Sequence, residues 1–185
     1  MTRLNTVQPE TATGRAKELL EAIQHKLGLV PNMTRAMANS PATLDGYLQL
    51  GGALAKGKLS ARVREQIALA VAEANGCDYC LAAHTAVAKA AGLTAEQARD
   101  ARRAAPVDPR TAAVVRFARR LVDVRGRVTA ADLAAVRAAG WDDGTIAEVI
   151  ANVALQVFTN YFNLAADTDL DFPAVPPLSR EPAAV

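Results

Sequence analysis

Apolar side chains recur at helical spacing along most of the chain, and glycine or proline interrupts the pattern at short intervals. Within residues 14–27 the repeating positions are Ala16, Leu19, Leu20, Ile23 and Leu27. No segment alternates strictly between apolar and polar residues over the length of a strand. The pattern therefore predicts an all-α fold, a bundle of about eight or nine helices.

Residues that cap or break helices divide this pattern into segments. Ser40, Ser60, Asp108 and Thr129 stand where helices begin, Thr94 and Gln97 form a capping box, and Gly28 and Gly76 close helices. The expected helices cover about 14–27, 31–39, 41–56, 61–75, 77–91, 95 onward, 109–124, 130–139 and 143–166. Residues 1–13 are expected to form an extended arm. A tail with Pro173, Pro176, Pro177 and Pro182 is not expected to continue as helix. No linker rich in Gly and Ser interrupts the chain, so we expect one domain over residues 1–185.

Composition and charge narrow the class of protein. The net charge of +2 gives no strong field for nucleic acid or an anionic membrane, so we expect neither as a partner. The arginines between Arg99 and Arg127 alternate with acidic and apolar residues, which is typical of a solvated helix face. Residues 1–20 lack the apolar core of a secretory signal, and no stretch is long and uncharged enough to span a bilayer. We therefore expect a cytoplasmic protein.

The only two cysteines, Cys77 and Cys80, lie three positions apart, and His84 follows one turn later. On a helix these three side chains share one face. Because Cys77 stands in the first turn, the helix N-terminus is expected to lower the thiol pKa values and favour the reactive thiolate. The pair has the spacing to close into a disulfide, and His84 is placed to exchange a proton with the Cys80 sulfur.

Two carboxylates precede this motif. Glu65 lies twelve residues before Cys77, and the turn at Asn75–Gly76 should fold its helix back against the cysteine helix. Glu65 is then expected near His84, where a carboxylate would orient the imidazole or accept a proton. A plain surface charge is the alternative interpretation of Glu65. Glu73 is closer in sequence to the turn, and we expect it to face solvent.

Other interpretations of the motif have specific requirements. Two helix cysteines can simply be small buried apolar residues. Zinc would need a fourth ligand beside Cys77, Cys80 and His84, and the only other histidine, His25, lies on a distant helix. Haem attachment needs histidine at the position of Leu81, and thioredoxin-like proteins need strands. No phosphate loop and no flavin or nicotinamide fingerprint occurs, so we expect no cofactor and no metal.

The combination of Glu65, the segment Cys77-Asp-Tyr-Cys80 and His84 resembles the signature of the alkylhydroperoxidase D and carboxymuconolactone decarboxylase family. The resemblance extends over about residues 40–173, with arms on either side, and is closest to the peroxidase-related subgroup. Tyr79 stands where the best-known alkylhydroperoxidase D proteins carry a second relay histidine. Members that decarboxylate a lactone lack the cysteine pair, which argues against that activity here.

This resemblance implies an all-helical subunit that assembles as a homo-trimer or homo-hexamer and reduces hydroperoxides. By position, Cys80 would be the peroxidatic thiol and Cys77 the resolving thiol, with His84 and Glu65 as the proton relay. A thiol or dithiol reductant, which the sequence does not identify, would then restore the pair. The alternatives are a redox-sensing or zinc-binding module, and a lyase or isomerase on the same fold.

Polar and aromatic residues on the last expected helix form two further groups. A polar stripe consists of Asn152, Gln156, Thr159 and Asn163. It is interpreted as the wall of a substrate channel, as a subunit contact, or as the solvent side of an amphipathic helix. Core or subunit-interface packing is expected for the aromatic group of Phe158, Tyr161 and Phe162, and Trp141 is expected to anchor a turn by packing.

Overall fold

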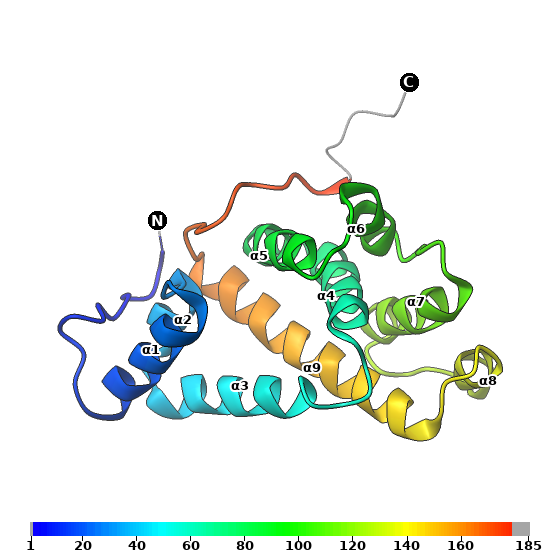
Figure 1. The fold of residues 1–185 in the computed structure, drawn as a ribbon, viewed down its shortest axis with the longest axis horizontal. Coiled ribbons are helices and arrows are strands. Elements are labelled where there is room, and N and C mark those ends of the chain that lie inside the picture. Colours follow the sequence, from blue (N-terminus) through cyan, green and yellow to red (C-terminus); the bar gives the residue numbers. More distant parts are fainter. Residues whose placement is uncertain (1, 179–185) are drawn as a thin grey trace.

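Residues 2–178, the part of the chain that the computed structural model describes, form nine α-helices and no strand (Figure 1). The helices are α1 (Gly14–Leu27), α2 (Asn32–Met37), α3 (Pro41–Leu54), α4 (Ala61–Asn75), α5 (Asp78–Ala90), α6 (Ala95–Arg102), α7 (Pro109–Asp123), α8 (Ala130–Ala138) and α9 (Asp143–Ala166). This confirms the all-α prediction. In the tail, Pro173 to Pro177 are not helical, and Pro182 lies outside the described residues.

The helix starts follow the predicted caps. The side chains of Ser40, Ser60 and Asp108 each accept a hydrogen bond from a backbone N–H of the first turn, at 3.3, 3.3 and 2.9 Å. Thr94 and Gln97 form the predicted capping box. Gly28 and Gly76 close α1 and α4 with φ of 75° and 63°, the left-handed conformation that glycine adopts without strain.

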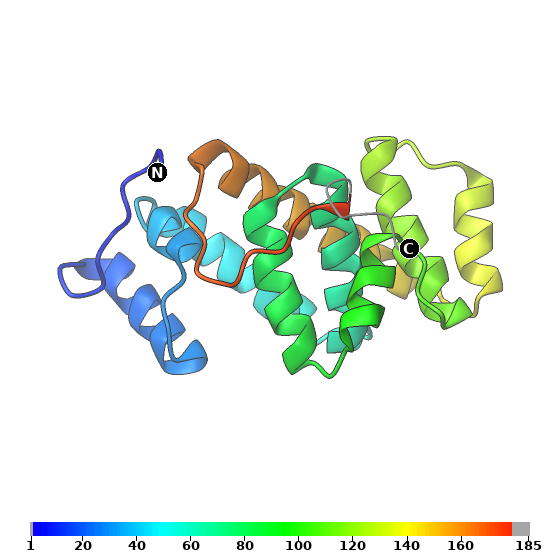
Figure 2. The same ribbon diagram turned by 90° about the horizontal axis from the view of Figure 1, so that it is seen from above.

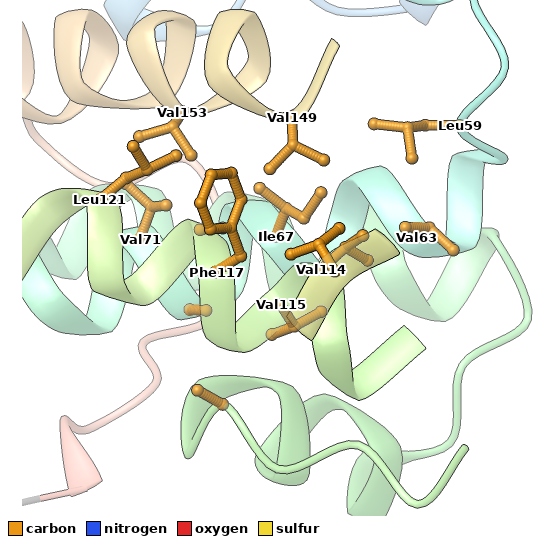
Figure 3. Close-up of a cluster of buried hydrophobic side chains, with 14 of the residues drawn as sticks. Leu59, Val63, Ile67, Val71, Val114, Val115, Phe117, Leu121, Val149 and Val153 are labelled. Carbon is orange, nitrogen blue, oxygen red and sulfur yellow. The ribbon is translucent and has the colours of Figure 1, made fainter. Parts of the chain in front are cut away.

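α4 lies at the centre of the fold and packs against α5, α6, α7 and α9 (Figures 1 and 2). Small buried residues such as Ala68, Ala70 and Ala72 allow these helices to approach closely. The largest apolar cluster lies between α4, α7 and α9, where Phe117 is 3% exposed (Figure 3). Its other labelled members are Leu59, Val63, Ile67, Val71, Val114, Val115, Leu121, Val149 and Val153.

A second apolar cluster joins α1, α2 and α3 to the start of α5. Leu20, Leu44 and Leu81 are fully buried in it, and both cysteines belong to it. The sulfurs are therefore held in a packed interior rather than in a surface loop, although the backbone that carries them is a helix start.

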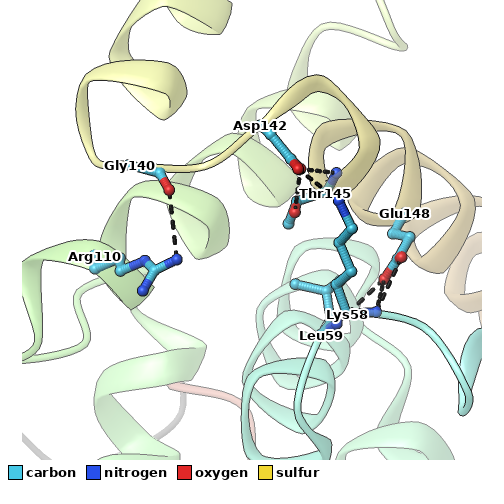
Figure 4. A network of polar contacts seen from close by, with 7 residues as sticks. All are labelled: Lys58, Leu59, Arg110, Gly140, Asp142, Thr145 and Glu148. Carbon is cyan, nitrogen blue, oxygen red and sulfur yellow. Dashed lines mark hydrogen bonds and ion pairs between the residues drawn. The ribbon is translucent and has the colours of Figure 1, made fainter.

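A polar network ties the segment before α4 to the first turns of α9 (Figure 4). The Glu148 carboxylate accepts hydrogen bonds from the backbone N–H groups of Lys58 at 2.8 Å and Leu59 at 3.2 Å. Lys58 Nζ lies 2.5 Å from Asp142 Oδ2, and Asp142 also caps α9 through Thr145 at 2.7 Å. These contacts fix the start of α4, and α4 carries Glu65.

Residues 167–178, here called the C-terminal strap, leave the end of α9 and cross over α5 (Figure 2). Asp171 Oδ2 accepts hydrogen bonds from the backbone N–H of Asn32 at 2.8 Å and from the Tyr79 hydroxyl at 2.6 Å. Further along, the Pro176 carbonyl accepts a hydrogen bond from Arg102 at 2.6 Å. The strap is thus bound to α2, α5 and α6 by polar contacts.

Two predictions of solvent exposure were wrong at one ion pair. The side chains of Glu73 and Arg102 are only 11% and 5% exposed, and Arg102 Nε lies 2.9 Å from Glu73 Oε2. The other Glu73 oxygen accepts a hydrogen bond from the backbone N–H of Leu178 at 2.8 Å. α6 and the strap cover this end of α4, so a carboxylate close to a turn is nevertheless buried.

Across residues 2–178, no helix combines the length and the apolar character that crossing a bilayer requires.

Candidate functional site

Cys77 and Cys80 form a disulfide at the start of α5, with their Cα atoms 5.2 Å apart. Cys77 is the residue that caps α5, rather than a residue inside its first turn, and its Sγ accepts a hydrogen bond from the Cys80 backbone N–H at 3.2 Å. The two residues are 1% and 3% exposed. The local fold explains this arrangement, because Gly76 turns the chain directly from α4 into α5.

The structure brings Glu65 and His84 into contact across α4 and α5. Glu65 Oε2 lies 2.8 Å from His84 Nδ1, and the two side chains are 16% and 21% exposed. Burial by itself lowers the pKa of His84, but the Glu65 charge, its hydrogen bond and a hydrogen bond to Gln156 together raise the pKa above its ordinary value. The imidazole is therefore biased toward its charged form, with Nδ1 occupied by the carboxylate.

A cavity of about 200 Å³ adjoins this group, and Cys80 and His84 both line it. The polar side chains of Gln156, Thr159 and Asn163 line it from α9. The remaining walls are mainly apolar and come from the end of α1 to α3, from α5, from α9 and from the strap: Leu27, Pro31, Met33, Tyr47, Gly51, Tyr79, Ala83, Val87, Leu155 and Phe172. Cys77 is not among the described lining residues, so Cys80 is the sulfur that a molecule in the cavity meets.

Tyr79 lines the cavity beside Cys80, but its hydroxyl is bonded to the strap. The hydroxyl donates to Asp171 Oδ2 at 2.6 Å and accepts from the Met33 backbone N–H at 3.3 Å. Burial and the contact with Asp171 raise the pKa of Tyr79, so this phenol keeps its proton. Its ring also meets Phe172 edge-on, with the ring centres 6.4 Å apart. The position therefore joins the strap to α5.

The polar stripe of α9 is mostly buried, and the solvent-side interpretation was wrong for it. Asn152, Thr159 and Asn163 are 4%, 5% and 3% exposed, and Thr159 and Asn163 line the cavity. The fold therefore supports the interpretation as a cavity wall for Gln156, Thr159 and Asn163, whereas Asn152 is buried away from the cavity. Asn163 contacts the disulfide directly, because its Nδ2 lies 3.5 Å from Cys80 Sγ.

The aromatic group of α9 divides between two environments. Phe162 packs against the second apolar cluster, as predicted, whereas Phe158 and Tyr161 are 38% and 60% exposed. Packing of these two at a subunit interface stays a prediction. Trp141 packs against the largest cluster, and its Nε1 donates to the Arg110 carbonyl at 2.8 Å, so the predicted anchor is confirmed.

Several cavity residues escaped the sequence analysis, among them Tyr47, Met33 and Phe172. Tyr47 lies on α3, where burial first and the Glu65 charge second raise its pKa. Met33 and Phe172 reach the cavity from α2 and from the strap. No local pattern marks any of them, because each comes from an element far away in the sequence.

The zinc alternative finds no set of ligands in the described part of the chain. No group of three or more His, Cys, Asp or Glu side chains in residues 2–178 is arranged to hold a metal ion. His25 is exposed on α1.

Comparisons with known proteins find one matching family model and several solved structures with the same fold. Residues 41–123 match the model of the carboxymuconolactone decarboxylase family. A peroxidase-related protein with an alkylhydroperoxidase AhpD core from Ralstonia eutropha JMP134 superposes with a TM-score of 0.83, at 24% identity over 92% of each chain. A peroxidase-related protein from Silicibacter sp. TM1040 gives 0.81, at 26% identity over 91% of each chain.

A third similar structure is a debrominase in complex with 2,3,4-tribromopyrrole, with a TM-score of 0.79 at 18% identity over 92% of each chain. This likeness concerns the fold alone. No curated protein sequence matches this chain.

Proposed function

Because the chain belongs to the alkylhydroperoxidase D and carboxymuconolactone decarboxylase family, we propose that it is a thiol-dependent peroxidase that reduces hydroperoxides through Cys77 and Cys80. One observation carries the proposal. Cys80 and His84 line the same cavity, while Cys77 is bonded to Cys80 and Glu65 to His84. A redox sulfur, its resolving partner and a proton relay thus meet at a space for a substrate.

In the proposed reaction, the thiolate of reduced Cys80 attacks the terminal oxygen of the hydroperoxide. An S–O bond forms, the O–O bond breaks, and the leaving alkoxide takes a proton from His84 to become an alcohol. Cys80 is then a sulfenic acid. We assign the attack to Cys80 because it lines the cavity, whereas Cys77 lies behind it.

Cys77 completes the oxidative half of the cycle. Its sulfur attacks the sulfenic sulfur of Cys80, the S–S bond forms, and the hydroxide that leaves takes up a proton and departs as water. An external dithiol then returns two electrons and two protons by thiol–disulfide exchange, which regenerates both thiols. The contact between Glu65 and His84 supports the relay, since it raises the pKa of His84 and so favours the protonated imidazole that would donate to the leaving alkoxide.

The assay is consumption of hydrogen peroxide and of an organic hydroperoxide by the purified protein with dithiothreitol as reductant. Cys80→Ser is expected to abolish consumption. Cys77→Ser is expected to lower turnover steeply, and the reduced variant, freed of dithiothreitol, should form one trappable sulfenic acid per chain on addition of peroxide. His84→Gln should lower the rate by about 10²–10⁴-fold, the usual contribution of a positioned acid. His25→Gln removes the exposed histidine of α1 and serves as the matched control, with an unchanged rate.

Several outcomes would overturn the proposal. Full activity in Cys80→Ser would remove the peroxidase assignment, and lactone turnover that survives both serine substitutions would favour a lyase. Reductive loss of bromide from a brominated pyrrole, without peroxide consumption, would keep the redox pair but change the substrate. The oligomeric state stays a prediction, which light scattering tests.

A further inference from the structure

Asn163, on the last turns of α9, places its amide nitrogen against the sulfur of Cys80. We propose that Asn163 is a catalytic hydrogen-bond donor that stabilises the Cys80 thiolate. Its Nδ2 lies 3.5 Å from Cys80 Sγ, 3.1 Å from Met33 Sδ and 2.9 Å from the Thr159 carbonyl oxygen. The inference rests on the proposed function in one respect, which is that Cys80 is the attacking sulfur.

Cys80 needs such a donor because the backbone N–H group at the N-terminus of α5 donates its hydrogen bond to Cys77 instead. The Cys80 backbone N–H donates to Cys77 Sγ at 3.2 Å, as the capping hydrogen bond of α5. Cys80 is 3% exposed and faces a mainly apolar cavity. Burial without a donor raises a thiol pKa and leaves less of the reactive thiolate. The Asn163 amide is the side-chain N–H group that faces this sulfur in the described residues.

The surroundings also fix which end of the amide faces the sulfurs. Rotating the side-chain amide by half a turn would aim Oδ1 at the Thr159 carbonyl oxygen and at two sulfurs, all of which are acceptors. Oδ1 is instead buried without a partner in residues 2–178. A buried orphan oxygen is unfavourable, so the contacts of Nδ2 outweigh it.

The donor responds to the oxidation state of the pair. One amide hydrogen goes to Thr159, and the other lies between Cys80 Sγ and Met33 Sδ. Disulfide and thioether sulfurs are weak acceptors, whereas a thiolate is a strong, charged one. After reduction, this hydrogen therefore bonds mainly to Cys80, in the state that attacks a substrate.

Asn152 provides a matched control on the same helix. It is 4% exposed, compared with 3% for Asn163. Its Nδ2 donates to the Glu148 carbonyl at 2.8 Å, just as Asn163 Nδ2 donates to the carbonyl of Thr159, in each case four residues earlier on the helix. Within residues 2–178, Asn152 neither lines the cavity nor donates a hydrogen bond to a sulfur. A substitution at Asn152 thus removes the structural bond without the contact to Cys80.

The test measures the thiol pKa of Cys80 without any peroxide. In a Cys77→Ser background Cys80 is the single thiol, and its pKa follows from thiolate ultraviolet absorbance and from alkylation rate against pH. Adding Asn163→Leu is expected to raise this pKa by about one unit, since hydrogen bonds to charged groups are of that order. Asn152→Leu should leave it unchanged. Asn163→Ala, which removes the amide without adding a charge, should also raise it.

An unchanged Cys80 pKa in Asn163→Leu, or an equal rise in Asn152→Leu, would overturn the inference. If Asn163→Leu does not fold by circular dichroism, Asn163→Ala decides, and an unchanged pKa there overturns the inference as well. This pKa measurement can succeed or fail independently of the peroxidase assay. An Asn163-dependent pKa in a protein that consumes no peroxide would refute the peroxidase assignment and leave the donor role intact.

Discussion

Replacing Arg102 by methionine is expected to lower the free energy of unfolding by about 3–5 kcal/mol, the cost of removing one partner from a buried ion pair. The substitution keeps the aliphatic length of the side chain but removes the guanidinium, which lies 2.9 Å from Glu73 Oε2. Glu73 is 11% exposed and keeps the backbone N–H of Leu178 as a partner. One backbone donor does not replace a buried positive charge.

Arg119 and Asp123 give a control pair of nearly the same length, 2.8 Å, with side chains 38% and 44% exposed. Arg119→Met is expected to cost at most about 1 kcal/mol, as exposed pairs do. Urea denaturation followed by circular dichroism measures both variants. A double substitution, Arg102→Met with Glu73→Leu, should recover part of the loss, because a packed apolar pair replaces a buried ionic one at little cost.

Equal losses in Arg102→Met and Arg119→Met would refute this reasoning. That result would mean that solvent screens the Glu73 carboxylate in solution, so the strap and α6 do not cover it.

Two further predictions concern stability. Gly57→Ala should cost about 1–3 kcal/mol by urea denaturation, because a Cβ there meets Glu148 Oε2 at 2.5 Å and displaces a carboxylate held by backbone N–H groups. Gly52→Ala, where nothing lies within 4 Å, should instead stabilise the helix by about 0.5–1 kcal/mol, and the same sign in both variants would contradict the clash. The raised pKa of His84 contributes stability that is complete below the ordinary histidine pKa and is lost as pH rises through the folded pKa. Urea midpoints of the disulfide form against pH should show this fall, and Glu65→Gln should flatten it; an unchanged slope would show that Glu65 does not hold the imidazole charged.

Local signals made the helix boundaries predictable from the sequence. Ser40, Ser60 and Asp108 act within one turn of their own position, so their capping role does not depend on the rest of the fold. The contact of Glu65 with His84 was also predictable, because the left-handed Gly76 ends α4 directly before α5 and allows the two helices to fold back against each other. Such inferences need only one turn and the helical period.

Burial set by distant segments was not predictable in the same way. Glu73 was expected to face solvent, but α6 and the strap cover it. The residues near Glu73 in the sequence do not indicate that these two distant segments pack there. The polar stripe of α9 had several interpretations, and only the packing of other helices selects the cavity wall. Asn163 belonged to that stripe, yet its contact with Cys80 joins residues 83 positions apart.

The reactive groups of the site and part of its pocket wall come from different kinds of structure, the helices and the strap. The helices α4 and α5 carry the carboxylate, the sulfurs and the imidazole, whereas Phe172 enters the cavity from an irregular segment held by side-chain contacts such as that of Asp171 with Tyr79. Changes in length or sequence around Phe172 alter the shape of the pocket while the helical framework is conserved. The shape of the pocket wall at Phe172 is therefore able to change independently of the disulfide and of the contact between Glu65 and His84.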